Sequence, residues 1–474
     1  MPRFLTVLET KIILKIIIER LAMMEQHPIL QMMKKENLTT LSFSFNKESQ
    51  NWDIILSKEW TKKIDWASED PKGFTKSIKK INKEEIKEII NRHQLEKYIN
   101  NLLRLVKSGR HELLEILYDS TWNLCSITAL HQTSKEYTVG GIRRSLMPKT
   151  EIEVISDILN LSRSMTFRCA AANLPCAGAC LGLHAPQSNP ETVDALAGFL
   201  AYVSRRYHVK WGIEAGFSQV ELKKISGYAD QLITNKNSDL IAACSAYSIY
   251  TAIKQALEYR YPDAKIAGKS IGIEGLGKLG SQLALLLLKA GADVIVTDMN
   301  PDQIQEFVKL HTPEYGAAIT AVSPGEIRMQ MGHVFIPCGH SGVLTRDNIH
   351  EIKYHIVIGG ANNVLLGNTI SEEIDLAEKL YRYKILYIPD WIANIGAVIC
   401  ATEIILTSNI PVLEDVQKKI EDICTPLIKE ILMQSRQQGK LPLDLAYQKF
   451  YPIIYKQDGT GIFHGNTQND IGNY

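Results

Sequence analysis

The segment from residue 271 to residue 298 restricts the possible folds of this chain more than any other part of its sequence. Residues 271–274 predict a short buried strand, residues 281–289 a helix, and residues 292–297 a second strand. A strand, a helix and a second strand in this order predict a parallel βαβ unit. The turn between the first strand and the helix carries the glycine spacing G-x-G-x-x-G.

The glycine turn predicts a site for a dinucleotide. Gly275 permits the tight turn, Gly277 lets a pyrophosphate approach the backbone, and Gly280 lets the helix pack closely on the strand. Lys278 and Leu279 lie between these glycines, where the N-terminus of the helix faces the phosphates. The alternative is a glycine turn in an ordinary α/β unit.

Asp298 ends the second strand of this unit and favours NAD as the cofactor. A carboxylate here accepts hydrogen bonds from the adenosine ribose hydroxyls and repels the 2′-phosphate of NADP. The alternative is a solvated loop aspartate.

The composition indicates a globular protein of more than one domain. The chain has 474 residues, of which 45% are hydrophobic and 22% charged, and its formal net charge is +1. A balanced charge provides no global field that would attract nucleic acid. The eight cysteines are scattered, without the dense spacing of secreted disulfide scaffolds, and this favours a cytoplasmic protein.

The first residues, 1–24, are apolar but interrupted by charged side chains. They lack the core of a signal peptide and an uninterrupted membrane span. A helix here would have a wide apolar face, which predicts burial against the rest of the protein or against a second copy in a homo-oligomer. The alternative is binding to a membrane surface.

Two further elements are expected before residue 110. Residues 41–57 read as a strand, a polar turn and another strand. Asn82 with Glu85 three residues later resembles a helix start, and Gly109 ends an amphipathic helix with a solvated charged face.

At several further motifs the chain resembles the glutamate/leucine/phenylalanine/valine dehydrogenases, and it is nearer to the leucine and phenylalanine branch. The resemblance covers residues 112–450, whereas the preceding part corresponds poorly. Its motifs occur in the family's order and are ALHQTSKEYTVGGIR (129–143), MTFRCAAANLPCAGAC (165–180), SAYSIYTAIK (245–254), VIGGANNVL (357–365) and YIPDWIANIGAVI (387–399).

The resemblance implies an α/β fold with an N-terminal substrate domain, a Rossmann-type NAD-binding domain and a cleft between them. It implies reversible oxidative deamination of an L-amino acid, with hydride passing between Cα and the nicotinamide. The expected divisions are an N-terminal helical and hairpin region (1–110), the substrate domain (111–250), the dinucleotide domain (251–400), and C-terminal helices returning to the substrate domain with a polar tail (401–474).

The resemblance assigns the substrate contacts to three motifs. Gly140 and Gly141 match the backbone that approaches the substrate. Arg168 replaces the first signature lysine and can still bind a carboxylate in bidentate fashion. Val139 stands where glutamate-specific members carry a lysine, so an apolar substrate side chain is expected. For Arg168 the alternative is a structural arginine at a helix end.

The resemblance also assigns three contacts near the cofactor. Asn362 and Asn394 match amides near the nicotinamide and the substrate, and Ser245 matches a hydroxyl that faces the cofactor. The alternative for each is an ordinary loop or helix-cap residue.

The catalytic position departs from the family pattern. Cys180 stands where the family has the lysine that polarises the substrate carbonyl and activates water. A thiol has no positively charged form, so it cannot stabilise an oxyanion as an ammonium does. Glu214 matches the family's proton-shuttling aspartate, although a one-residue shift would place Ala215 there instead. Ordinary reductive amination is therefore expected to be weak.

Three other roles are open to the cysteines near residue 180. Their spacing does not match a C-x2-C metal site, and no metal is expected. Small cysteines packed in the core are the simplest alternative, and a nucleophilic Cys180 activated by Arg168 is another.

Two classes of function follow. The first is an NAD-dependent oxidoreductase acting on an apolar amino acid, a 2-oxo acid or an imine, with Glu214 or Cys180 as altered proton-transfer groups. The second is an NAD-binding pseudoenzyme of the same fold with a sensing, regulatory or assembly role.

Overall fold

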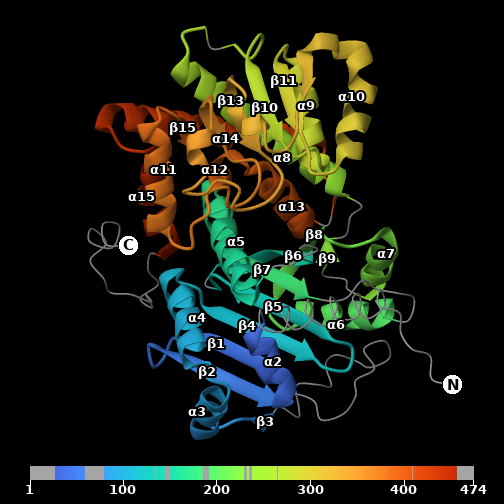
Figure 1. Cartoon of the computed structure of the whole chain (residues 1–474), viewed down its shortest axis with the longest axis vertical. Helices are drawn as coiled ribbons and strands as arrows, with labels where there is room; N and C mark the ends of the chain where they lie inside the picture. The colour runs from blue at the N-terminus through green and yellow to red at the C-terminus, as the bar shows by residue number, and fades with distance from the viewer. Residues whose placement is uncertain are drawn as a thin grey trace, which may run out of the picture.

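The protein folds around two β-sheets, which lie at opposite ends of the long axis in Figure 1. The computed structural model describes residues 27–58, 79–133, 135–144, 150–184, 192–228, 232–233, 237–263, 265–407 and 409–455. The apolar segment 1–24 and the polar tail after residue 455 lie outside the described residues.

The first sheet is mixed and has nine strands in the order β3-β2-β1-β4-β5-β7-β6-β8-β9. The neighbouring strands β7, β6 and β8, toward one edge of the sheet, are parallel to one another, whereas the strands from β5 outward to β3 pair antiparallel. The strands are β1 (Thr40–Asn46), β2 (Asn51–Lys58), β3 (Lys79–Lys80), β4 (Leu113–Asp119), β5 (Leu124–Leu130), β6 (Tyr137–Arg144), β7 (Cys176–His184), β8 (Val209–Ala215) and β9 (Leu232–Ile233).

The expected hairpin at 41–57 is confirmed, because β1 and β2 pair antiparallel around the turn at residues 47–50. The expected helix start is also confirmed, because the side chain of Asn82 accepts a hydrogen bond from the backbone N–H of Glu85. The prediction of a single helix that ends at Gly109 is wrong. The chain instead forms α3 (Lys83–Arg92) and α4 (Glu96–Ser108), and Gln94 between them has a positive φ of 55°.

Helices cover both faces of the nine-stranded sheet. One face packs against α2 (Pro28–Lys35), α3, α4 and α5 (Glu151–Ala171). The other face packs against α6 (Val193–Arg205) and α7 (Gln219–Tyr228). A capping box between Thr150 and Glu153 starts α5, the long helix that runs from this sheet toward the second one (Figure 1).

The second sheet is parallel throughout and has the order β12-β11-β10-β13-β14-β15. This confirms the predicted Rossmann-type unit, in which helices connect parallel strands. Its strands are β10 (Ser270–Glu274), β11 (Asp293–Thr297), β12 (Ile319–Ala321), β13 (Gly332–Pro337), β14 (Tyr354–Ile358) and β15 (Leu386–Ile388). Its helices are α8 (Ser238–Arg260), α9 (Lys278–Lys289), α10 (Pro301–Tyr315) and α11 (Ile370–Arg382).

The last helices connect the two sheets. They are α12 (Asp390–Ala393), α13 (Gly396–Thr407), α14 (Leu413–Gln438) and α15 (Pro442–Tyr455). Helix α14 packs along α8, whereas α12, α13 and α15 all contact α5. The C-terminal part of the chain therefore holds α5 against the Rossmann side.

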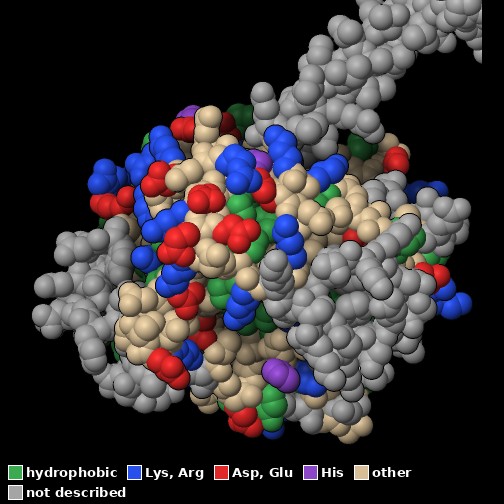
Figure 2. Space-filling model, turned by 90° about the horizontal axis from the view of Figure 1, so that it is seen from below, with side chains coloured by type: hydrophobic (Ala, Val, Ile, Leu, Met, Phe, Trp, Pro, Cys, Tyr) green, Lys and Arg blue, Asp and Glu red, His purple; other side chains and the backbone are tan. Residues whose placement is uncertain are grey.

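The surface agrees with the nearly neutral composition. In Figure 2, Lys and Arg side chains are interspersed with Asp and Glu side chains on the face shown. Among the helices that the structure describes, none is both long and apolar enough to cross a membrane.

Candidate functional site

A cavity of about 1010 Å³ has walls from both the nine-stranded sheet and the Rossmann unit. Most of the predicted site residues meet in its lining: Val139, Gly140, Gly141, Arg168, Cys180, Ser245, Lys278, Leu279, Asn362 and Asn394. Glu214 belongs to β8, but its side chain is outside the described structure. The motifs that lie far apart in the sequence thus converge on one space, as expected for a site in a cleft between two domains.

Three parallel strands form one wall of this cavity. Gly141 of β6 pairs with Cys180 of β7 on one side and with Gly212 of β8 on the other. A Cβ atom added to Gly212 would meet only one atom, at 4.0 Å, so the space above this glycine is open. At the Gly141–Gly212 pair the wall therefore has no side chains.

The small residues around Cys180 let α5 pack directly on β7. A Cβ on Gly178 would lie 2.2 Å from the carbonyl oxygen of Ser162, and the Gly178 N–H donates to Thr166 Oγ1 at 2.8 Å. A Cβ on Gly182 would lie 2.3 Å from a side-chain carbon of Ile158. The low bulk of this stretch is thus a requirement of helix–strand packing.

Cys180 itself is fully buried at the border of the cavity and the core beneath α5. Within the parts of the chain that the structure describes, no group of three His, Cys, Asp or Glu side chains is placed to hold a metal ion.

Arg168 lies near the end of α5 and is held by Asp390 at the start of α12. Its Nη2 atom is 3.2 Å from Asp390 Oδ2, and both side chains are 4% exposed. Asp390 also accepts the backbone N–H of Asn363 at 3.2 Å. Burial raises the pKa of Asp390, while Arg168 opposes that rise. Sequence reasoning missed Asp390, although it lies inside the YIPDWIANIGAVI motif.

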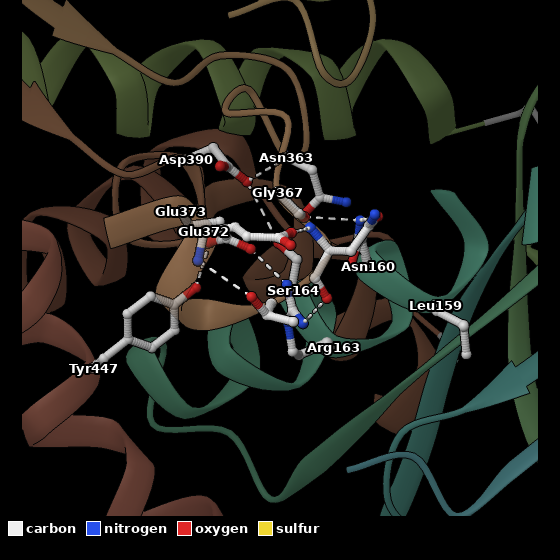
Figure 3. Close-up of polar contacts among 12 residues, drawn as sticks. Leu159, Asn160, Arg163, Ser164, Asn363, Gly367, Glu372, Glu373, Asp390 and Tyr447 are labelled. Atoms are coloured by element: carbon white, nitrogen blue, oxygen red, sulfur yellow. Dashed lines mark hydrogen bonds and ion pairs between the residues drawn. The ribbon is translucent and has the colours of Figure 1, made fainter. Parts of the chain in front are cut away.

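A second polar network fixes α5 against the Rossmann side (Figure 3). Arg163 forms a 2.5 Å ion pair with Glu373 of α11, and the Tyr447 hydroxyl donates to the same carboxylate at 2.5 Å. Asn160 donates to the carbonyl of Gly367 at 3.0 Å. These buried contacts place α5, and with it Arg168, relative to the cofactor side.

The glycine turn has the geometry that its sequence predicts. Gly275 has a φ of 105°, and a Cβ on Gly280 would lie 1.9 Å from the carbonyl oxygen of Gly275. A Cβ on Gly277 would have no neighbour within 4 Å, so its backbone is open to a ligand. Asp298 accepts the backbone N–H of Leu276 at 2.7 Å, which places its carboxylate against the turn.

Lys278 begins α9 beside this turn. Its ammonium donates to Ser238 Oγ at 2.6 Å and pairs with Asp239 at 2.8 Å. The N-terminus of α9 and this lysine together give the cofactor side of the cavity a positive end.

Asn394 offers a buried acceptor in the cavity wall. Its Nδ2 atom donates to the carbonyl of Gly360 at 2.8 Å, whereas its Oδ1 atom has no hydrogen-bond partner among the described residues. A buried amide oxygen without a partner is costly unless a ligand satisfies it. Asn394 therefore suits a ligand with an N–H donor, such as a carboxamide.

Lys210 is a cavity residue that sequence reasoning did not identify. It belongs to β8, is half-buried and stands opposite Val139 of β6 in the sheet. The sequence does show a charged residue directly before Trp211 and Gly212. Which face of the sheet its side chain lies on depends, however, on the register of β8.

Comparisons with known proteins agree with this architecture. Residues 240–450 match the family model described as Glutamate/Leucine/Phenylalanine/Valine dehydrogenase. The chain is 29% identical over 368 residues to a phenylalanine dehydrogenase from Lysinibacillus sphaericus, which covers 75% of this chain and 92% of the relative. It is 26% identical over 353 residues to a leucine dehydrogenase from Bacillus subtilis, covering 73% and 91% respectively.

A solved structure extends the similarity to the fold. The crystal structure of L-tryptophan dehydrogenase from Nostoc punctiforme matches with a TM-score of 0.56 and 25% identity, over 74% of this chain and 98% of that one. The glycine turn, the shared cavity and these matches give one conclusion. Over residues 240–450 the chain is similar to the glutamate/leucine/phenylalanine/valine dehydrogenase family, and its similarity to individual dehydrogenases of this family extends over about three quarters of its length.

Proposed function

We propose that this protein is an NAD-dependent oxidoreductase that interconverts an apolar L-amino acid with its 2-oxo acid or a related imine. The observation that carries the proposal is a cavity that extends from a buried arginine, Arg168, to Lys278 and Leu279 at the start of α9, directly after the glycine turn. The phenylalanine, leucine and tryptophan dehydrogenases among its relatives support the same reaction class.

Each end of the cavity has its own role. Arg168 binds the substrate carboxylate while Asp390 holds the guanidinium in place. Gly140 and Gly141 let the substrate approach the sheet, and Val139 contributes an apolar wall. The apolar lining continues on α13, which contributes Ala397, Val398, Ala401 and Ile405.

NAD fits the other end. The backbone of Gly277 and the N-terminus of α9 would hold the pyrophosphate, Asp298 the adenosine ribose, and Asn394 with Asn362 and Ser245 the nicotinamide end. When bound, the nicotinamide supplies or accepts the hydride. The protein's residues orient the substrate carbon toward it and handle the protons.

Turnover is the direct test. NADH oxidation is measured with ammonia and a panel of branched and aromatic 2-oxo acids, on the native protein and on Arg168→Met. Loss of a charge-assisted hydrogen bond of about 1.5–3 kcal/mol should raise the KM for the 2-oxo acid about 10- to 100-fold and leave NADH affinity unchanged. Absence of turnover with every amino and 2-oxo acid would overturn the proposal and leave a non-catalytic NAD-binding protein, an alternative that the named relatives do not favour.

We also propose that the protein is a cytoplasmic homo-oligomer. The support is the apolar stretch at residues 1–24 and the lack of a secreted cysteine pattern. A monomer by light scattering at high concentration would contradict the oligomer.

A further inference from the structure

We propose that Lys210 supplies the ammonium group that position 180 lacks, and so acts as the acid that protonates the reacting oxygen. This inference rests on the proposed function, because it names a further catalytic residue for the same reaction. The ammonium comes from β8 instead of β7, and Lys210 reaches the space beside position 180 across the intervening strand β6.

The register of the sheet supports this placement. Lys210 pairs with Val139, and two residues further along the strands Gly212 pairs with Gly141, which pairs with Cys180. Lys210 and Cys180 are thus separated by two strand spacings across the sheet and by two residues along the strands. At ordinary strand geometry, this separation is on the order of 12 Å between their Cα atoms. Both line the cavity.

The wall between the two positions offers no obstacle. Gly141 and Gly212 have no side chains, and the space above Gly212 is open. A lysine has a long flexible stem, so an ammonium reaching inward from Lys210 and one reaching from position 180 would both come to lie above these glycines.

Charge balance singles out Lys210 among the cations of the cavity. Arg144 pairs with Glu221, Arg168 with Asp390, and Lys278 with Asp239. Arg143 also lines the cavity and has an interaction of its own. The ammonium of Lys210 has no hydrogen bond or ion pair with any described residue. A half-buried cation without a counter-charge, next to the apolar side chain of Val139, is suited to meet negative charge on a ligand.

The chemistry needs one proton donor at this place. When ammonia adds to the 2-oxo carbon, the carbonyl electron pair moves to oxygen, and the ammonium of Lys210 stabilises the resulting oxyanion. The positively charged nitrogen of the adduct then transfers a proton to this oxyanion, which leaves a neutral amino group and a hydroxyl group on the same carbon. The hydroxyl takes a proton from Lys210 and leaves as water, while the nitrogen lone pair forms the C=N bond of the protonated imine. Lys210, now a neutral amine, regains a proton from solvent, so the step consumes no other reagent.

The first test separates catalysis from binding. Lys210→Met is compared with Lys97→Met, an exposed lysine on α4, in NADH oxidation with phenylpyruvate and ammonia. Lys210→Met should lower kcat about 10²- to 10⁴-fold, as is typical for loss of an acid–base group, and leave NADH affinity by calorimetry unchanged. Lys210→Arg, which keeps the charge but cannot release a proton, should also lose kcat but keep the KM for phenylpyruvate.

A lysine placed at position 180 tests whether the activity lost in Lys210→Met can be restored. The double variant Lys210→Met/Cys180→Lys should recover part of the activity lost in Lys210→Met, because the ammonium returns to the same space from β7. Wild-type activity in Lys210→Met would overturn the inference and leave the proposed function standing.

A second measurement does not depend on turnover. A short pulse of an acetylating N-hydroxysuccinimide ester, followed by peptide mass spectrometry, reports how accessible each lysine is. NADH with phenylpyruvate, without ammonia, should protect Lys210 and leave Lys97 equally labelled. Labelling of Lys210 that is unaffected by these ligands would overturn the inference, whereas protection without turnover by any variant would support its placement and overturn the proposed reaction.

Discussion

The guanidinium of Arg168 lies 3.2 Å from the carboxylate of Asp390, and both side chains are almost completely buried. The arginine that we assign to the substrate carboxylate is therefore already part of an ion pair. Asp390 holds the guanidinium and reduces the cost of burying its charge before any ligand arrives.

The Arg168–Asp390 pair gives the first prediction. Asp390→Asn should lower the free energy of unfolding by about 3–5 kcal/mol, because it removes the buried carboxylate that faces the Arg168 guanidinium. The matched control is Glu378→Gln, which breaks the exposed pair of Glu378 with Arg382 and should cost less than about 1 kcal/mol. Urea unfolding measures both, and equal losses would contradict the buried pair as described.

The two glycines of the turn should behave differently. Gly280→Ala should reduce both stability and NADH binding, because its Cβ would lie 1.9 Å from the carbonyl oxygen of Gly275. Gly277→Ala should fold normally and bind NADH more weakly, because its Cβ has room in the protein but occupies the approach to the backbone. Gly325→Ala, also with an open Cβ, is the control. Thermal melting and calorimetric titration distinguish the cases; normal stability in Gly280→Ala would count against the geometry.

Asp298 should make the protein prefer NAD(H) over NADP(H) by about tenfold or more, because its carboxylate repels the 2′-phosphate. Asp298→Asn should narrow this preference and still keep the acceptor for the Leu276 N–H, which Asp298 now binds at 2.7 Å. Titration of both cofactors into both proteins provides the measurement. Equal affinities in the native protein would refute the assignment.

Glu151 should make stability depend on pH. It accepts the backbone N–H groups of Ile29 and Leu30 at 3.0 and 3.1 Å and thereby holds the start of α2. Burial is the largest influence on its carboxyl group and raises the pKa from 4.5 to about 7, although these hydrogen bonds oppose the rise. The folded protein thus keeps this proton to higher pH than the unfolded chain does.

The stabilising contribution of protonated Glu151 is therefore complete below pH 4.5 and is lost as the pH rises through 7. The loss amounts to at most about 3 kcal/mol. Glu151→Gln should flatten this part of the pH dependence in urea unfolding, and Glu96→Gln, an exposed acid in the first turn of α4, should leave it unchanged. Identical slopes in the native protein and Glu151→Gln would show that Glu151 is not the source.

The local elements were predictable where one short segment contains all of the relevant signals. The βαβ unit follows from two apolar runs and three spaced glycines, and the hairpin β1–β2 from two apolar runs around a polar turn. The same reasoning failed between α3 and α4, because no glycine or proline marks the break at Gln94, whose backbone takes a positive φ. A glutamine side chain does not signal such a break by itself.

The sequence by itself determined the dinucleotide turn, the Rossmann unit, and the absence of a lysine at position 180, because each depends on residue types at fixed spacing within one segment. Only the tertiary structure decided that Asp390 neutralises Arg168, that the glycines beside Cys180 serve the packing of α5, and that Lys210 lines the cavity opposite Val139. These relationships join segments separated by tens to hundreds of residues. Strand register and helix packing bring them together, and a shift of one residue in β8 would turn Lys210 to the other face of the sheet.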